Sequence, residues 1–571
     1  MNKKNLKYIL VVEACSSGIN FIQDIKMRGY KPLVLEIKTD DEFYIKTLRV
    51  QARKRYLSDA VVISEQNTYA KTLALVKKYH PIAAVVGSEL GVELGTRLMN
   101  DLNLPSNPYS KIKQYINKDA MHLALKKAGL RYIRGKIIYN EKEAFNFYKE
   151  LGVKEVVLKP MRGAGSVGVY FCSNFDEIKE RLNTCKNSAN FFGQKFDGVL
   201  MQERIKGVEC FVNTMSLNKK HRILSMWKYS IDETNDGKMI FDNIESLNHL
   251  EVNSTQLVQY ALDCLDALGV ENGPAHTEFF IDEKGPIMIE INCRVAGCSM
   301  PITFLDRIFG HHDTDQILDD LLYPRHFSYY YLQDYVTYEK GIIKLFIVPK
   351  EFTAISAPVI KMVSHLKSFH NAYIEPIRNM RKLERTIDLE SAGGTVFLVN
   401  KDHHLVQRES EFLHLLELYY FNILFEGKKE ESRNIKKIAY SKKLIDRLIE
   451  ISRESGSTIL LTDKNHHYEG VKIVDINHVL ENYNDYELGI IDINFAKLEK
   501  DGLSRSNTFE IIYEFLHKIR RGGYVVIPES TYASALYQSQ GIEILLRLAG
   551  YEIQSPNMRM RNLVYAKKID N

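Results

Sequence analysis

The sequence predicts a multidomain protein of the α/β and α+β classes, on three observations. Residues 6–110 alternate short apolar strand patterns with amphipathic helix patterns, which is typical of a parallel sheet covered by helices. Residues 199–292 contain strand patterns that are joined by polar turns, as in β-hairpins. From residue 436 onward strands and helices alternate again, and 571 residues allow three or four domains at ~150 residues each.

The composition is ordinary for a soluble globular protein, with 45% apolar and 26% charged residues. The 77 basic and 72 acidic side chains leave a net charge of +5, which predicts no dedicated nucleic-acid surface. Seven scattered cysteines without C-x-x-C spacing favour reduced thiols over disulfides or a zinc site. The N-terminal apolar run is too short for a signal peptide, and no apolar run reaches about 18 residues, so we expect a cytoplasmic protein without a membrane span.

The first strands and helices define an N-terminal α/β domain. Tyr8–Val12 is the first predicted strand, Gly18–Arg28 the helix after it, and Pro32–Ile37 the second strand. Ile82–Val86 is a further strand, and Glu89 follows it at the start of an amphipathic run. The turn after the first strand lacks G-x-G-x-x-G, so no dinucleotide site is expected there.

A helix signal follows this domain. Asn117 suits an N-cap, Asp119 suits the positive start of a helix, and apolar residues recur at positions 121, 125 and 128. Lys118 lies at this helix start, and a solvated lysine is the simplest interpretation of the residues alone.

A glycine-rich loop joins two predicted strands, Val153–Lys159 and Val169–Cys172. Its three glycines permit positive φ and close backbone approach, so that successive N–H groups can face one anion, and Lys159 at the strand end can reach the same anion. The loop is not a P-loop, because no G-x-x-x-x-G-K-[ST] precedes a helix. A phosphate site is therefore one interpretation, and by itself a weak one.

Two further strands, Cys210–Leu217 and His221–Tyr229, are predicted before the last motif. The second strand carries Trp227, which is the only tryptophan, and Lys228. A half-buried aromatic on a sheet is the simpler interpretation of Trp227, and a substrate contact is the alternative.

A predicted hairpin over Gly273–Asn292 places Glu278, Glu290 and Asn292 on one face, with Arg294 two residues further on. Same-face residues of a strand lie about 7 Å apart. Two carboxylates on one face repel each other unless a cation lies between them, and carboxylate and amide oxygens suit magnesium. The alternative is a sheet face with two solvated acids.

Taken in order, these motifs resemble the ATP-grasp superfamily, and most of all its L-amino-acid ligases, with carnosine synthase and biotin carboxylase sharing the core. HTEFFxDExGPxxIEINCR at 276–294 resembles the metal-binding hairpin, and VLKPxxGAGSxGV at 157–169 resembles the loop that closes over the triphosphate. E-x-I-x-G-x-E at 203–209 resembles the segment that meets adenine and ribose. The resemblance covers roughly residues 6–425.

The resemblance implies a domain plan. Residues 1–112 form the N-terminal α/β domain, and residues 113–335 form the ATP-grasp core with its nucleotide-binding subdomain at about 135–205. Residues 336–425 form the C-terminal ATP-grasp subdomain. The charged stretch 426–435 is the predicted linker to the last domain.

The resemblance also implies ATP and one or two Mg²⁺, with Mn²⁺ as a substitute, and assigns roles to residues. Arg294 and Lys159 are the catalytic candidates, and Arg294 would neutralise the acyl phosphate or oxyanion. The simpler alternative for Arg294 is a salt bridge to Glu290, which is compatible with that role. The metal candidates are Glu278, Glu290 and Asn292. The nucleotide candidates are Lys118, Lys159, Gly163, Ala164, Gly165, Ser166, Gly168, Glu203, Ile205 and Glu209. The substrate candidates are His276, Glu89, Trp227 and Lys228, and Glu89 could equally be a first-turn acid of a helix.

The implied activity is a ligase that activates a carboxylate as an acyl phosphate and couples it to an amine. The expected substrates are small molecules of specialised metabolism, such as amino acids or peptides; a homo-oligomer is compatible with the sequence. An ATP-dependent carboxylase of the biotin carboxylase type is the first alternative, although no M-K-M biotin acceptor occurs. A nucleotide-binding regulator and a bifunctional ligase–methyltransferase are the others.

The last part of the chain again alternates strand and helix patterns. The predicted helices are Phe509–Arg520 and Ile542–Leu548, and the predicted strands are Thr458–Leu461, Val471–Ile476, Leu488–Ile493, Tyr524–Pro528, a strand near Tyr551 and Leu563–Ala566. In this order, residues 436–571 resemble the C-terminal half of SAM-dependent methyltransferases, through I-R-R-G-G-Y-V-V-I-P-E and L-L-R-L-A-G-Y-E-I. The resemblance implies a Rossmann-like domain. However, the first strand, Thr458–Leu461, is followed by Thr462–His467 rather than by a glycine-rich loop. We therefore expect a degenerate domain that serves interaction or substrate docking.

Overall fold

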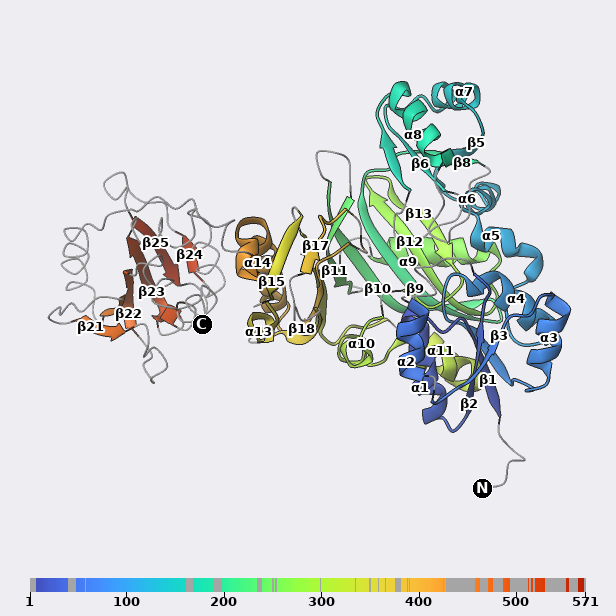
Figure 1. Cartoon of the computed structure of the whole chain (residues 1–571), viewed down its shortest axis with the longest axis horizontal. Helices are drawn as coiled ribbons and strands as arrows, with labels where there is room; N and C mark the ends of the chain where they lie inside the picture. Colours follow the sequence, from blue (N-terminus) through green and yellow to red (C-terminus); the bar gives the residue numbers. More distant parts are fainter. Residues whose placement is uncertain are drawn as a thin grey trace. The chain divides into compact units, whose positions relative to one another are not determined.

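The computed structural model describes most of residues 7–424, without residues 40–47, 161–167, 188–197, 234–238 and 375–380 and some single positions and pairs. Beyond residue 424 it describes seven strands and a few helical residues (Figure 1). The chain divides into two compact units, residues 1–341 with 387–390, and residues 342–386 with 391–571. The finer domain boundaries remain predictions.

The first unit begins with a parallel four-stranded sheet in the order β3-β2-β1-β4. Its strands are β1 (Tyr8–Val12), β2 (Lys31–Glu36), β3 (Val61–Ser64) and β4 (Ala83–Val86). Its helices are η2 (Ser16–Ile19), α1 (Asn20–Met27), α2 (Val50–Tyr56), α3 (Tyr69–Lys77) and α4 (Gly91–Asp101). The three predicted strands are confirmed, β3 was not predicted, and the predicted helix at 18–28 begins as the 3₁₀ turn η2.

Both faces of β1 are buried, as expected for a parallel strand between helices. Ile9 and Val11 join an apolar cluster with Phe21 of α1, whereas Leu10 joins another cluster with Val92 of α4. The chain order reverses between β1 and β4, so this sheet has its topological switch point there. The carboxyl ends of both strands lie at the same edge of the sheet. The turns after these two strands lie very close together. A Cβ atom added at Gly18 would lie only 2.2 Å from the carbonyl oxygen of Gly87, so only glycine fits at position 18.

A small antiparallel sheet, in the order β5-β8-β6-β7, follows three short helices. Its strands are β5 (Gly135–Ile138), β6 (Val156–Lys159), β7 (Tyr170–Cys172) and β8 (Val199–Glu203). The helices around it are η4 (Tyr109–Lys111), α5 (Ile112–Ile116), α6 (Lys118–Lys127), α7 (Glu141–Leu151) and α8 (Phe175–Asn187). Lys159 ends β6 and Gly168 precedes β7 at φ 77°, but the glycine-rich loop between them, with Gly163–Ser166, lies outside the described residues.

The core of the first unit is an antiparallel sheet in which β13-β12-β9-β10-β11 are neighbours. Its strands are β9 (Val208–Leu217), β10 (Lys220–Glu233), β11 (Met239–Ser246), β12 (Gly273–Asp282) and β13 (Gly285–Asn292). Helix α9 (Ser254–Leu268) packs its apolar residues against Phe279 and Met288. Helices α10 (Ile302–Phe309), α11 (Asp313–Leu322) and α12 (Pro324–Tyr331) follow the hairpin.

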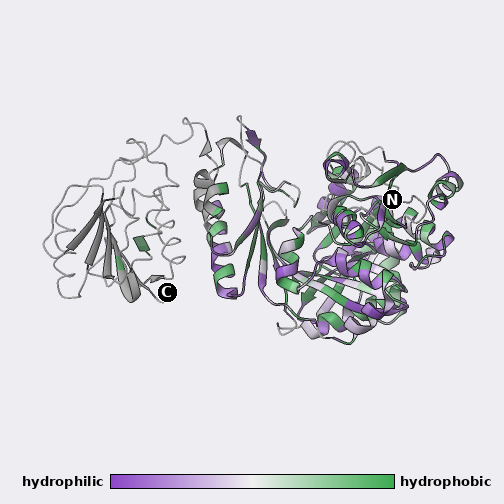
Figure 2. Cartoon of the chain, turned by 90° about the horizontal axis from the view of Figure 1, so that it is seen from below, coloured by the Kyte–Doolittle hydropathy of each residue, from purple (hydrophilic) through white to green (hydrophobic). Residues whose placement is uncertain are grey.

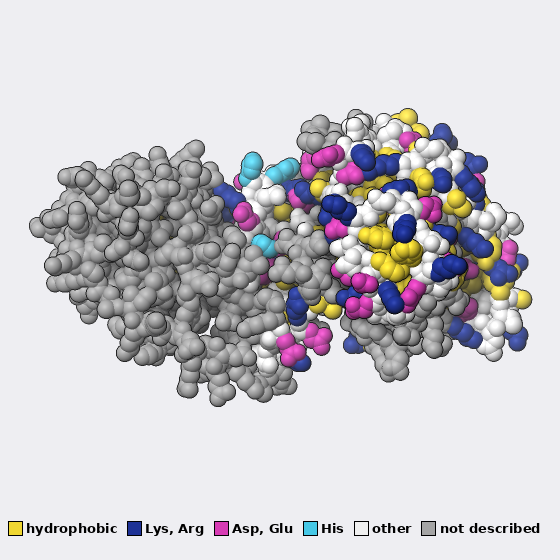
Figure 3. Space-filling model, turned by 90° about the horizontal axis from the view of Figure 1, so that it is seen from above, with side chains coloured by type: hydrophobic (Ala, Val, Ile, Leu, Met, Phe, Trp, Pro, Cys, Tyr) yellow, Lys and Arg dark blue, Asp and Glu magenta, His cyan; other side chains and the backbone are white. Residues whose placement is uncertain are grey.

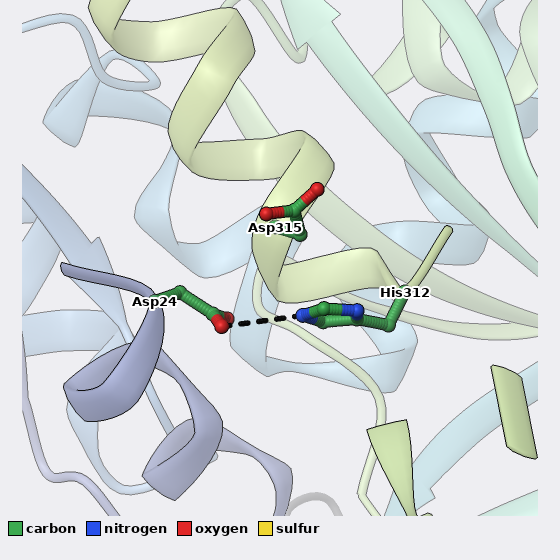
Figure 4. Close-up of side chains that lie close together, drawn as sticks. All are labelled: Asp24, His312 and Asp315. Carbon is green, nitrogen blue, oxygen red and sulfur yellow. Dashed lines mark hydrogen bonds and ion pairs between the residues drawn. The ribbon is translucent and has the colours of Figure 1, made fainter. Parts of the chain in front are cut away.

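A buried polar network fixes α11 against α1 (Figure 4). His312 Nε2 lies 3.2 Å from Asp24 Oδ1, and His312 Nδ1 lies 2.7 Å from Asp306 Oδ1. Arg28 Nη2 lies 2.6 Å from Asp315 Oδ1. Asp24, His312 and Asp315 lie close enough to share one ion. However, both ring nitrogens of His312 already face carboxylates, so the cluster is a structural ion network.

This network makes the stability of the protein depend on pH. Burial alone would lower the pKa of His312, but the hydrogen bonds with Asp24 and Asp306 raise it to about 10. Because the unfolded value is about 6.5, the stabilisation is complete below that pH and is lost as the pH rises toward 10. We expect His312→Asn to cost about 3–5 kcal/mol at pH 6 and progressively less toward pH 10. Urea unfolding across this range checks the prediction, and a difference that stays constant with pH would contradict it.

The second unit contains three neighbouring strands in the order β14-β18-β16, a small sheet β17-β15-β19, and two helices. The strands are β14 (Lys340–Leu345), β15 (Phe352–Ser356), β16 (Phe369–Tyr373), β17 (Arg381–Leu383), β18 (Thr395–Asn400) and β19 (Glu426–Gly427), and the helices are α13 (Val359–Ser364) and α14 (His403–Leu424). Both hydrophobic and hydrophilic residues occur along the described part of α14 (Figure 2). The first two residues of the predicted linker thus form β19.

The last part of the second unit is a sheet in the order β21-β20-β22-β23-β25-β24. The pairs among β21, β20, β22 and β23 are parallel, and β25 pairs antiparallel with both β23 and β24. Its strands are β20 (Thr458–Thr462), β21 (Val471–Asp475), β22 (Tyr486–Asp492), β23 (Ile519–Pro528), β24 (Tyr551–Ile553) and β25 (Leu563–Lys568). The predicted strands are confirmed. The predicted helix at 509–520 extends too far, because β23 already begins at Ile519. The predicted helix at 542–548 and most of the loop after β20 lie outside the described residues.

Basic and acidic side chains of the described residues are interspersed on the face shown in Figure 3. No helix within the described ranges has the length and apolarity needed to cross a bilayer.

Candidate active site

The β12–β13 hairpin brings the predicted metal candidates together. Glu278 lies opposite Glu290 in the strand register, and His276 lies opposite Asn292. Asn292 Nδ2 donates to Glu290 Oε1 at 3.1 Å. The alternation of apolar and polar residues in the two strands places all three predicted side chains on the same face of the hairpin.

Two lysines from other elements reach this hairpin. Lys118, at the start of α6, forms an ion pair with Glu290 Oε2, and Lys159, at the end of β6, is buried beside it. Burial alone would raise the pKa of Glu290, but Lys118, Lys159 and the Asn292 hydrogen bond lower it to about 2. Burial and then repulsion from Lys118 lower the pKa of Lys159 to about 8. The site thus concentrates both positive and negative charge out of water.

A third acidic side chain, Glu209 of β9, lies near the same two glutamates. Burial, followed by repulsion from Glu278 and Glu290, raises the pKa of Glu209 to about 8. A cation bound between these acids would relieve the repulsion, and two carboxylates with an amide oxygen are ligands that Mg²⁺ shares with phosphate and water. The residues present therefore fit a magnesium ion.

Arg294 pairs with Glu89 and not with Glu290. Its Nε donates to Glu89 Oε2 at 3.0 Å and its Nη1 donates to the Val295 oxygen at 2.8 Å. Glu89 follows β4 at the switch point of the N-terminal sheet. The sequence indicated each residue separately, but the ion pair joins segments about 200 residues apart in the chain, which no local pattern could reveal.

His276 forms part of a hydrogen-bonded chain that the sequence did not predict. Asn213 Nδ2 donates to Asp313 Oδ2 at 2.9 Å, so Asn213 Oδ1 faces His276 Nδ1, which lies 2.8 Å away. His276 Nε2 then lies 3.2 Å from Glu278 Oε1. Since Asn213 Oδ1 only accepts, Nδ1 carries the hydrogen of this contact. His276 thereby orients Glu278, and both of its ring nitrogens face protein groups.

The structure also shows the contacts and burial of the remaining described candidates, Glu203, Ile205, Lys228 and Trp227. Glu203 accepts from Arg134 N at 2.8 Å and from Arg134 Nε at 2.9 Å, and Ile205 is half-buried just after it. Lys228 pairs with Glu245 at 2.8 Å. Trp227 is fully buried, rather than half-buried as expected, and its ring stacks against Phe211 and Phe304.

Residues 153–302 match the family model of the ATP-grasp domain. The chain is 25% identical over 324 residues to dapdiamide A synthase of Enterobacter agglomerans, covering 57% of this chain and 75% of that protein. It is 23% identical over 320 residues to the carbamoyl phosphate synthase large chain of Thermotoga maritima, covering 50% of this chain and 26% of that one.

Solved structures show the same fold at low sequence identity. An L-amino acid ligase from Bacillus licheniformis superposes with a TM-score of 0.55 at 15% identity, covering 72% of this chain and 98% of that one. A phosphoribosylglycinamide synthetase from Anaerococcus prevotii superposes with a TM-score of 0.52 at 14% identity, with the same coverage of 72% and 98%.

Proposed function

Because residues 153–302 form an ATP-grasp domain, we propose that this chain is an ATP-dependent ligase that activates a carboxylate as an acyl phosphate and couples it to an amine. The observation that carries the proposal is the paired carboxylates Glu278 and Glu290, which face each other in the hairpin beside Lys118 and Lys159. Phosphoryl transfer depends mainly on positioning and on charge neutralisation, and this cluster supplies both.

In the first step a carboxylate oxygen of the substrate attacks the γ-phosphorus of ATP, and ADP leaves. Lys159 and Lys118 hold the phosphate oxygens with their ammonium groups. Bound Mg²⁺, held by Glu278, Glu290 and Asn292, would neutralise the charge of the phosphate oxygens. His276 keeps Glu278 in place, and Glu209 and the segment Glu203–Ile205 contact the nucleoside.

In the second step the amine nitrogen attacks the acyl carbon, inorganic phosphate leaves, and the amine gives up a proton. Arg294 lies at the end of the metal hairpin and stabilises the negative charge that develops on the acyl oxygen or the phosphate. A guanidinium suits this role because it is planar, permanently charged and able to donate two parallel hydrogen bonds. Glu89 fixes the orientation of the guanidinium.

The proposed substrates are two small molecules, an amino acid or peptide with a free carboxylate and an amino acid with a free amine. The likeness to a dapdiamide synthase in sequence, and to an L-amino acid ligase in fold, supports this substrate class and a role in specialised metabolism.

Release of ADP and phosphate from Mg·ATP tests the proposal, with amino acids supplied singly and in pairs. We expect release only with certain pairs, together with a product whose mass is the sum of the two substrates minus water. Release that requires bicarbonate instead of an amine would show a carboxylase. ATP binding without any release across the panel would count against amino-acid ligation.

For residues 436–571 we propose a Rossmann-like domain that serves docking. The support is the parallel order of β21-β20-β22-β23 with the antiparallel β25 at the edge of these four. We propose no methyl transfer, because β20 is followed by Asp463–His467 instead of a glycine-rich loop.

A further inference from the structure

Four polar side chains form a row across the core sheet, which we call the polar row. The strand registers place Ser225 of β10 opposite Asn213 of β9 and Asn213 opposite His276 of β12. His276 in turn lies opposite Asn292 of β13. Residues directly opposite each other in antiparallel strands lie on the same face, and Glu278 lies on that face two residues after His276. The polar row therefore lies directly beside the proposed metal ligands.

The polar row is buried, and a helix covers one end of it. Ser225, Asn213, His276 and Asn292 are 0%, 4%, 6% and 7% exposed. Asp313, the first residue of α11, accepts at Oδ2 from Asn213 Nδ2 at 2.9 Å and from Ser225 Oγ at 3.3 Å. Apolar side chains of similar shape would stabilise a buried sheet face about as well, so stability alone does not explain the polar row.

The hydrogen bonds of the polar row fix its direction. Asn213 Nδ2 donates to Asp313 Oδ2 and also to Ser225 Oγ, at 3.0 Å. The reverse orientation of the amide would bring its oxygen against the carboxylate of Asp313, and both groups only accept. Asn213 Oδ1 therefore faces His276 Nδ1 at 2.8 Å, so Nε2 is the ring nitrogen that meets Glu278 Oε1, at 3.2 Å. The carboxylate on α11 thus decides which ring nitrogen contacts the metal ligand.

We propose that Asp313 and Asn213 are positioning residues that act through His276 on Glu278, and that they thereby set the affinity of the site for its divalent cation. The role of Glu278 as a metal ligand rests on the proposed ligase function. Groups that hydrogen-bond to the surroundings of a metal ligand fix its orientation, and their loss typically lowers metal affinity about 10–100-fold. The ring of Phe211, 4.9 Å from the imidazole of His276, restricts the imidazole further.

Binding of Mn²⁺ tests the proposal without turnover. Free Mn²⁺ is measured by electron paramagnetic resonance in mixtures of the full-length protein with ADP, and in the same mixtures without protein. Leucine is close to asparagine in shape but neither donates nor accepts, so we expect Asn213→Leu to weaken protein-dependent binding about tenfold or more. Asp313→Asn keeps the shape but removes the charge that directs Asn213, and it should weaken binding in the same direction. This second variant decides the test if Asn213→Leu does not fold.

A double-mutant cycle with Glu278→Ala separates positioning from a general loss of packing. If Asn213 acts through Glu278, then Asn213→Leu should weaken Mn²⁺ binding no further in the Glu278→Ala background. Asn107→Leu is the matched control, because Asn107 is another buried asparagine, whose Oδ1 accepts from the backbone N–H groups of Glu271 and Asn272 at 2.8 and 3.0 Å. It should lower the melting temperature and leave Mn²⁺ binding unchanged.

ADP release with the amino-acid panel is measured in parallel, so that the two proposals fail separately. Wild-type Mn²⁺ affinity in both Asn213→Leu and Asp313→Asn, with ADP release intact, overturns the positioning role and leaves the ligase function standing. An equal loss from Asn213→Leu with and without Glu278 also overturns it, because Asn213 then does not act through that ligand. A loss that disappears in the Glu278→Ala background, without ADP release from any pair of amino acids, supports the positioning role and contradicts the ligase. Absence of protein-dependent Mn²⁺ binding in the wild type overturns the positioning role together with the metal site.

Discussion

Replacing Glu290 with glutamine is expected to lower kcat for ADP release about 1,000-fold, equivalent to about 4 kcal/mol of transition-state stabilisation. Glu290 lies opposite Glu278 and accepts from both Lys118 and Asn292. Glutamine keeps the shape and can still accept from Lys118, but it removes the charge that a magnesium ion requires. Single-turnover measurements at saturating ATP, repeated over a range of Mg²⁺ concentrations, check the prediction.

Glu283→Gln is the matched control for this variant. Glu283 lies in the exposed turn of the same hairpin. The substitution therefore removes one negative charge from the same hairpin, as Glu290→Gln does, but it does not contact Glu278, Glu290 or the two lysines. We expect it to retain full activity. Unchanged ADP production by Glu290→Gln, with its melting temperature also unchanged, would remove Glu290 from the metal site.

Replacing Arg294 with lysine is expected to lower kcat about 100-fold, with little effect on the KM for ATP. Lysine keeps the positive charge but cannot present two parallel donors to a planar or tetrahedral oxyanion while also pairing with Glu89. The loss should therefore appear in the chemical steps, and rapid-quench measurement of the acyl phosphate and the final amide shows which step slows.

Arg307→Lys provides the comparison, because Arg307 forms an equivalent arginine–carboxylate pair with Glu339 on the surface, where its side chain is 41% exposed. That variant should be fully active. If Arg294→Lys lowers the melting temperature and its activity recovers fully at lower temperature, the Arg294–Glu89 pair is structural, and the proposed role in neutralising the oxyanion is wrong.

Periodicity predicted individual elements well wherever one strand or helix carries its own pattern. The alternation of Ile289 with Glu290 and Asn292 predicted the face of β13, and the apolar run at Tyr8–Val12 predicted β1. Errors occurred at ends and in short segments. The predicted helix was extended to Arg520, but β23 already begins at Ile519. The apolar residues of this stretch suit either a helix or a buried strand, so their pattern does not locate the boundary.

The candidate site also contains features that local sequence patterns predict and contacts that they do not predict. The sequence by itself determined the chemistry of the hairpin, since the spacing of Glu278, Glu290 and Asn292 follows from the period of two residues in a strand. It also determined which lysines precede the hairpin in the chain. Only the tertiary structure decided that Lys118 pairs with Glu290, that Arg294 pairs with Glu89, and that Asn213 connects His276 with Asp313. These contacts join residues between 63 and 205 positions apart, so they depend on the packing of whole sheets, which local patterns do not encode.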